Sequence, residues 1–211
     1  MTTAFWICIF LVFYTYIGYG IVLYLLVKLK RIVRPEKRDS ETETELPHVT
    51  LMICAYNEED IVDKKMENTN ALDYPKEKLH VLWVTDGSND LTNQRLAKYD
   101  NVTVAFKPER KGKTAALNHG IKEVKTDIVA MTDANTMLND QAMKVIVAEM
   151  KNPKVGCVAG EKRVMARDDK QSAAEGEGLY WKYESCLKRL DSELHSAMGA
   201  AGELCAIRTT L

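Results

Sequence analysis

The 211-residue sequence lacks any cysteine arrangement that would build a disulfide framework or a zinc site. Its five cysteines are an odd number and are scattered singly, with no Cys-x-x-Cys or Cys/His spacing among them. Isolated cysteines of this kind are typical of small buried residues in a reducing compartment. We therefore expect free thiols, and we exclude the disulfide-rich class of secreted domains.

The sequence also lacks an excess of either charge, since 29 basic and 30 acidic residues give a formal net charge of -1. A nucleic-acid-binding domain would need a strongly basic face, so no nucleic-acid partner is expected. The GxxxxGK[ST] spacing of a P-loop is missing, and no internal repeat is visible. The length suffices for one α/β domain and an anchor, but not for two full domains.

Charge is entirely missing from residues 4–27. At ~1.5 Å per residue, 24 helical residues span about 36 Å, which exceeds the ~30 Å hydrocarbon core of a bilayer. A cleaved signal peptide is the alternative, but it would carry basic residues before a shorter apolar run and a small-residue cleavage site. Here the basic cluster follows the run, at Lys28, Lys30, Arg31 and Arg34. We expect residues 1–34 to hold a retained transmembrane helix in the cell (inner) membrane, with the rest of the chain in the cytosol.

Residues 35–47 are polar, charged and bracketed by prolines, which predicts a linker. Beyond them, apolar runs alternate with helical patterns, which predicts parallel βαβ units in one α/β domain over 48–211. The first helix is expected to start with Asn57 as its N-cap. The expected strands are 48–55, 79–86, 101–106, 127–133, 155–161 and 204–208. The expected helices are 57–72, 90–98, 112–124, 140–150 and 172–196.

Polar residues stand where three of these strands end: Asp86, Asp133 and the segment Ala55-Tyr56-Asn57. Ligands of doubly wound sheets bind beyond the carboxyl ends of the strands. A single aspartate there can simply form a turn or cap a helix, but three such ends should converge on one crevice. Clustered carboxylates need a cation to relieve their repulsion, or one of them must be protonated. Asp133 and Asn135, two residues apart, offer oxygen ligands that suit Mg²⁺ or Mn²⁺ rather than zinc.

A basic segment precedes the expected helix 112–124 and surrounds Gly112 with Lys107, Arg110, Lys111 and Lys113. Glycine permits a close approach of the backbone, and a helix N-terminus favours an anion such as a phosphate. The segment could equally be a solvated charged loop, and the sequence pattern alone leaves both readings open.

Together these segments resemble the family 2 glycosyltransferases, which have the nucleotide-diphospho-sugar transferase (GT-A) fold. The resemblance covers nearly all of residues 48–211. The matching segments are AYNEE (55–59), VTDGSND (84–90), GKTAALNHGI (112–121), MTDAN (131–135) and GAAGELCAIR (199–208). In addition, GLYWKYES (178–185) is similar to the membrane polysaccharide synthases of the family, which include the cellulose, hyaluronan and poly-N-acetylglucosamine synthases.

The resemblance implies inverting transfer of a sugar from a nucleotide-sugar donor, a UDP-sugar, to a glycan acceptor with the help of Mg²⁺ or Mn²⁺. It implies that Asp86 binds the base or ribose of the uridine and that Lys113 lies by the diphosphate. The metal would be held by Asp133, the first acid of a DxD-type motif, and by Asn135, which replaces the second acid. The nucleoside pocket would be lined by Ala55, Tyr56 and Glu58.

The family carries its catalytic base after the segment that corresponds to 199–208, and its QxxRW motif later still. No residue of this chain matches that base, so we expect it beyond Leu211; Glu203, the nearest acid, belongs to another motif. Two alternatives stay open. One is a membrane-tethered module that binds a nucleotide-sugar without catalysis, and we expect residues 1–211 alone to bind a UDP-sugar weakly without useful transfer. The other is a nucleotidyltransferase, which would show a glycine-rich basic loop after its first strand.

Overall fold

The computed structural model describes residues 2–34, 45–162, 171–197, 199 and 202–210, and it contains two compact units. The first unit is formed by Met1–Glu43 and Lys162–Gly199, and the second by Thr44–Glu161 and Ala200–Leu211. Most of the predicted linker 35–47 lies outside the described residues.

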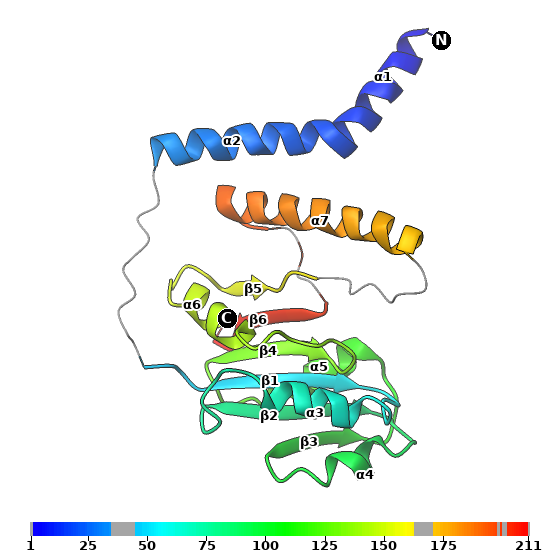
Figure 1. The fold of residues 1–211 in the computed structure, drawn as a ribbon, viewed down its shortest axis with the longest axis vertical. Coiled ribbons are helices and arrows are strands. Elements are labelled where there is room, and N and C mark those ends of the chain that lie inside the picture. Colours follow the sequence, from blue (N-terminus) through cyan, green and yellow to red (C-terminus); the bar gives the residue numbers. More distant parts are fainter. Residues whose placement is uncertain (1, 35–44, 163–170, 198, 200–201, 211) are drawn as a thin grey trace. The chain divides into compact units, whose positions relative to one another are not determined.

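The second unit is built on a six-stranded sheet with the strand order β3-β2-β1-β4-β6-β5 (Figure 1). β1, β2, β3 and β4 are parallel, whereas β6 runs antiparallel to both β4 and β5. The predicted α/β fold with a mostly parallel sheet is therefore confirmed. The strands are β1 Val49–Ala55, β2 Leu79–Asp86, β3 Val102–Lys107, β4 Ile128–Asp133, β5 Cys157–Ala159 and β6 Leu204–Arg208.

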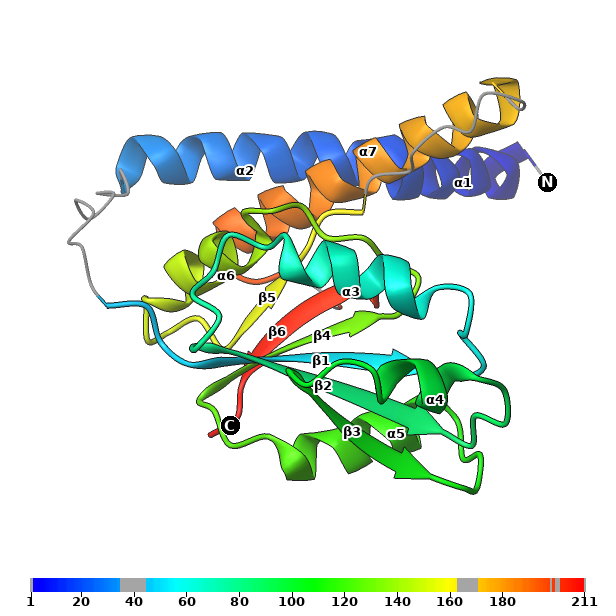
Figure 2. The same ribbon diagram turned by 60° about the horizontal axis from the view of Figure 1, so that its bottom comes forward.

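The central strand β1 is apolar along both of its faces because helices cover both sides of the sheet. Leu51 and Ile53 belong to one core cluster and Met52 to another, as expected from side chains that alternate across a strand. α5 covers one face of the sheet, and α3 and α6 cover the other (Figure 2). The helices of this unit are α3 Val62–Asn70, α4 Thr92–Leu96, α5 Lys113–Gly120 and α6 Ala142–Met150, with a 3₁₀ turn, η2, at Ile121–Glu123.

Asn57 does not cap the first helix of this unit, so that prediction was wrong. α3 begins only at Val62, and Asn57 has φ 52°, in the left-handed region that asparagine tolerates better than most residues. Its side-chain oxygen accepts the backbone N–H of Asn89 at 3.0 Å, and its amide donates to the Asn89 side chain at 2.9 Å. The residue therefore joins the ends of β1 and β2, and the chain needs further residues before it can enter the helix.

The first unit contains one long apolar helix, Thr2–Val33, with a mean hydropathy of 2.0 in its most apolar window. It consists of α1 Thr2–Phe13, a π-turn η1 Tyr14–Gly18 and α2 Tyr19–Val33. By length and composition it is a candidate membrane span, in line with the predicted helix that precedes the sheet. α7 (Gln171–Leu194) packs against α2 in this unit.

The contact between α2 and α7 is apolar at its centre and polar toward its ends. Leu190 packs with Leu23 and Val27, which are 3% and 1% exposed. The Tyr19 hydroxyl donates to Asp191 at 2.6 Å, and the Arg31 guanidinium donates to Glu193 at 2.7 Å. One side of α2 is thus covered by a helix of the same unit.

Candidate functional site

The carboxyl ends of the parallel strands meet at one edge of the sheet. The register pairs Cys54 of β1 with Asp133 of β4, and Ala55 of β1 with Thr85 of β2. Asp86, the next residue of β2, pairs with Lys107 of β3. The segments that the sequence singled out therefore lie together, which is the place where sheets of this type bind ligands.

At this edge, Asp133 forms an ion pair with Lys113, the first residue of α5. The Lys113 Nζ lies 2.6 Å from Asp133 Oδ1 and 3.5 Å from the carbonyl oxygen of Gly202. Both side chains are partly open to solvent, at 51% for Lys113 and 31% for Asp133. A partly exposed cationic group thus lies against the aspartate.

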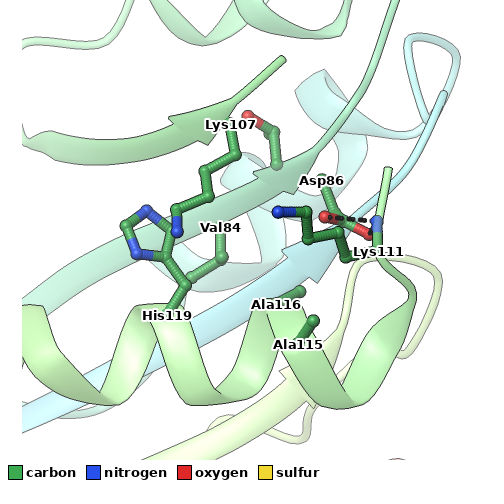
Figure 3. Close-up of a pocket in the computed structure, with 8 residues that line it drawn as sticks. Val84, Asp86, Lys107, Lys111, Ala115, Ala116 and His119 are labelled. Carbon is green, nitrogen blue, oxygen red and sulfur yellow. Dashed lines mark hydrogen bonds between the residues drawn. The ribbon is translucent and has the colours of Figure 1, made fainter. Parts of the chain in front are cut away.

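Asp86 binds the basic segment that precedes α5. Its carboxylate accepts the backbone N–H of Lys111 at 2.9 Å (Figure 3). It also accepts the backbone N–H of Gly112 at 2.6 Å. The basic segment can approach the end of β2 closely because residue 87 is a glycine with φ 72°. A Cβ at this position would lie 2.7 Å from the backbone nitrogen of Arg110. Asp86 and Gly87 together order the segment 107–112, which the sequence alone could not distinguish from a solvated loop.

Tyr56 lies at the end of β1, and its ring is covered by the same segment. The Arg110 guanidinium carbon is 3.8 Å from the centroid of the ring, a cation–π contact. The ring remains 37% exposed. The exposed ring of Tyr56 thus carries a planar cationic group stacked on its face.

Burial, and to a smaller extent the carboxylates at the strand ends, shift the pKa of two groups beside Asp133, Glu58 and Cys54. Partial burial raises the pKa of Glu58, and the charges of Asp133 and Asp90 raise it further. Burial raises the pKa of the Cys54 thiol to about 11, with Asp133 as the second cause. Ala55, between them, is buried. A cation near Asp133 would reduce the part of each pKa shift that comes from the charge of Asp133.

The oxygen ligands at this edge fit a hard metal ion only in part. Among the residues that the structure describes, no group of three or more His, Cys, Asp and Glu side chains could hold a metal. Mg²⁺, however, is often bound through one or two carboxylates, with the remaining ligands from phosphates and water. Asp133 and the exposed amide of Asn135 suit such a site, and the Lys113 ammonium already occupies a cation position beside Asp133.

The described residues form a small and a larger cavity beside the sheet. A cavity of about 30 Å³ next to Asp86 is lined by Lys107, Lys111 and His119 among others, which is room for a water molecule but not for a nucleoside (Figure 3). A larger one, of about 750 Å³, lies at the opposite edge, where His48 and His80 stack on each other. None of the segments singled out in the sequence reaches that second cavity, and the strands begin there rather than end.

The structure therefore brings together Tyr56, Asp86, Lys113 and Asp133, with Ala55, Glu58 and Asn135 beside them; their roles stay predictions. It also reveals two residues that the sequence reading missed, Lys65 and Asn68 of α3, which bind the segment after Asp133. The sequence indicated the burial of Lys65 in one way only: this lysine lies on the same face of the expected helix as the apolar residues Val62 and Met66.

Comparisons with known proteins agree with this geometry. A family model described as glycosyl transferase family 2 matches residues 50–209. A poly-beta-1,6-N-acetyl-D-glucosamine synthase of Staphylococcus aureus is 34% identical over 125 residues, which cover 57% of this chain and 30% of the relative. A probable glycosyltransferase of Bacillus subtilis, YdaM, is 35% identical over 133 residues, covering 59% and 32% of the two chains. The chain thus spans about 30% of the length of these curated relatives.

Solved structures show the same fold. The mannosyltransferase PcManGT of Pyrobaculum calidifontis, in complex with GDP-Man and Mn²⁺, has a TM-score of 0.72 and 25% identity over 92% of this chain and 53% of that one. TarS 1-349 of S. aureus, in complex with UDP-GlcNAc, has a TM-score of 0.52 and 23% identity over 59% of this chain and 37% of that one. The second likeness shows the fold alone. Together the matches confirm the predicted nucleotide-diphospho-sugar transferase architecture.

Proposed function

The chain belongs to glycosyl transferase family 2, and on this premise we propose that it forms the donor-binding part of a membrane-anchored transferase that uses a UDP-sugar. The observation that carries the proposal is the convergence of Tyr56, Asp86, Lys113 and Asp133 at one edge of the sheet. Such a set offers a stacking surface for a base, an acceptor for its N–H groups, and cationic and metal-binding groups for a diphosphate. The acceptor in this proposal is a growing glycan, and transfer proceeds with inversion.

The choice of a UDP-sugar is supported by likeness to the poly-beta-1,6-N-acetyl-D-glucosamine synthase, whose product is a polymer of N-acetylglucosamine. Tyr56 would stack on the base once Arg110 has moved from its ring. Asp86 would accept a hydrogen bond from the base or ribose through a lone pair that the Lys111 and Gly112 N–H groups leave free. Ala55 and Glu58 would complete the wall of the nucleoside pocket.

Departure of the diphosphate needs positive charge where negative charge develops. Lys113 is suited to this, because its ammonium can leave Asp133 and turn to the phosphates while staying at the N-terminus of α5. A Mg²⁺ or Mn²⁺ ion held by Asp133 and Asn135 would supply Lewis-acid stabilisation of the leaving diphosphate when bound. The proposal assigns no described residue as general base, and so it concerns donor binding and activation.

The two alternatives predict different results. A module that only binds the donor would share every contact above and would not release UDP from a UDP-sugar when an acceptor is present. A nucleotidyltransferase would bind a nucleoside triphosphate at these groups, but the first strand end carries AYNEE instead of a glycine-rich basic loop. The geometry favours neither alternative over the transferase, and the family match favours the transferase.

Donor binding by the 211-residue chain tests the proposal directly. We expect UDP to bind to the detergent-solubilised protein, and Mn²⁺ to tighten the binding by at least about tenfold, since metal and phosphates complete each other's coordination. Isothermal titration with UDP, in Mn²⁺ and in EDTA, gives the two affinities. ATP titrated in the same way is the control for a nucleotidyltransferase. Equal UDP affinity with and without Mn²⁺ would contradict the metal assignment, and no UDP binding at all would contradict the site.

We also propose that Thr2–Val33 spans the cell membrane, with the sheet-forming unit in the cytoplasm. The support is the apolar helix itself and the basic residues Lys28, Lys30, Arg31 and Arg34 at its end. In a variant without the natural cysteines, Glu45→Cys should react with a membrane-impermeant maleimide only after the cells are permeabilised. Thr3→Cys, at the other end of the helix, is the matched control and should react in intact cells. Labelling of Glu45→Cys in intact cells would place the domain outside.

A further inference from the structure

Lys65 of α3 is fully buried, with 0% exposure, between the core residues Val62 and Met66. Its ammonium donates a hydrogen bond to the Thr136 carbonyl oxygen, and no carboxylate in the described part of the chain forms an ion pair with it. Burial lowers the pKa of Lys65 to about 8, and the charge of Asp133 acts against this shift. Burying a charge without a counter-ion is costly, and an apolar side chain of similar length would fill the space at a lower cost. Stability alone therefore does not explain a lysine at this position.

Asn68, one helical turn after Lys65, binds the same stretch of chain. Its side-chain amide donates to the Leu138 carbonyl oxygen at 2.7 Å, and its side-chain oxygen accepts the Leu138 N–H at 2.9 Å. Positions 65 and 68 lie on one face of a helix because three residues make nearly one turn. α3 thus holds the segment between β4 and α6 at two points, Thr136 and Leu138.

This segment carries the proposed metal ligands. Asp133 ends β4, Asn135 follows two residues later, and a turn closes between them with the Thr136 N–H donating to the Asp133 carbonyl oxygen at 3.2 Å. The Ala134 N–H donates to the Cys54 carbonyl oxygen, also at 3.2 Å, which ties the turn to β1. The Thr136 carbonyl, at the end of the turn, has Lys65 as its partner from the protein interior. Lys113 contacts Asp133 at the start of the turn, and Lys65 contacts Thr136 at its end.

We infer that Lys65, assisted by Asn68, is a positioning residue that holds the turn 133–136 in the geometry in which Asp133 and Asn135 present their oxygens to a metal ion. The inference rests on the proposed function, because it gives a role to the surroundings of the proposed metal ligands. Groups that orient metal ligands typically change metal affinity by about 10–100-fold when they are removed. Lys65 would do so through the backbone, without touching the metal or the donor.

The variant Lys65→Met tests this, because methionine fills the volume of the lysine stem without its charge or its hydrogen bond. We expect UDP affinity in EDTA to stay within about twofold of wild type. The Mn²⁺ increment, which is the factor by which Mn²⁺ raises the UDP affinity, should fall by about tenfold or more. The melting temperature in EDTA should stay equal or rise, since a buried charge has been removed. Lys64→Met is the matched control: this neighbouring lysine is exposed on the same helix, and its replacement should change none of the three quantities.

The outcomes separate the possible roles. A merely structural lysine would lower the melting temperature and weaken UDP binding equally in EDTA and in Mn²⁺, which would overturn the inference. Should Lys65→Met not fold, Asn68→Ala decides: a loss of about threefold or more, confined to the Mn²⁺ increment, supports the inference, and an unchanged increment overturns it. If Mn²⁺ raises the UDP affinity of both variants as much as it raises that of wild type, the positioning role is refuted and the proposed function still stands. If Mn²⁺ does not raise the UDP affinity of the wild-type protein at all, both the positioning role and the proposed metal site are refuted.

Discussion

Asp133→Ala should abolish the part of UDP binding that depends on Mn²⁺. Asp133 is the one carboxylate of the proposed metal site, and removal of a group that merely orients a ligand already costs about 10–100-fold in metal affinity. We therefore expect a loss of at least about 100-fold in Mn²⁺ affinity at saturating UDP. Binding of UDP in EDTA should persist, because Lys113 is released from its 2.6 Å ion pair and is free to meet the diphosphate. Titration of Mn²⁺ into the UDP-saturated protein measures the effect.

Two variants make this result interpretable. Asn135→Ala should weaken Mn²⁺ binding less than Asp133→Ala does, since a neutral amide oxygen is a weaker ligand for a hard cation than a carboxylate. Asp127→Ala removes an exposed acid just before the opposite end of the same strand and should leave both affinities unchanged. If wild type and Asp133→Ala bind Mn²⁺ and UDP equally well, the assignment of Asp133 is wrong.

Asp86→Ala should weaken UDP binding whether or not Mn²⁺ is present. The carboxylate of Asp86 accepts N–H groups of Lys111 and Gly112, and hydrogen bonds to charged groups contribute about 1.5–3 kcal/mol each. Without these hydrogen bonds the segment 107–112 is less ordered, and the contact to the nucleoside is lost as well. We expect the binding free energy of UDP to fall by about 3 kcal/mol, which corresponds to roughly 100-fold in affinity. Isothermal titration with UDP, in EDTA and again in Mn²⁺, should show the same ratio to wild type under both conditions.

Asp86→Asn is the conservative partner of this variant. It keeps one side-chain oxygen for the N–H of Gly112, so it should retain more affinity than the alanine variant. The experiment thereby distinguishes the two aspartates. Replacing Asp133 should reduce only the gain in UDP affinity that Mn²⁺ provides, whereas replacing Asp86 should reduce the UDP affinity both in EDTA and in Mn²⁺. A loss in Asp86→Ala that appears only with Mn²⁺ would mean that Asp86 belongs to the metal site and not to the nucleoside site.

Much of the fold and of the candidate site could be predicted from the sequence. Strands that are buried on both faces read as continuous apolar runs, and this made β1, β2 and β4 visible with their ends at Ala55, Asp86 and Asp133. The rule that parallel strands end at the same edge of a sheet then predicts that these residues lie close together. The register of Cys54 with Asp133 bears this out.

Other features were beyond the sequence because they depend on contacts between distant segments. Asn57 had the residue type and the position of a helix cap, yet it pairs with Asn89, 32 residues away, and the helix starts later. The long helix α7 lies between sheet-forming segments in the sequence, and in the structure it belongs to one compact unit with the apolar N-terminal helix. Local propensity cannot reveal either outcome, since both are decided by which surfaces meet.

The sequence by itself determined the fold class and the residues at the strand ends, because parallel sheets translate hydrophobic periodicity, a local property, directly into position. The family followed from the resemblance of its motifs to those of known members. The tertiary structure alone decided what those residues touch. Lys65 reads in the sequence as an ordinary charged residue of a helix, and only its burial beneath the turn 133–136 turns its ammonium toward the Thr136 carbonyl. Burial is a property of the packed chain, and it is burial that makes a charge costly enough to demand a role.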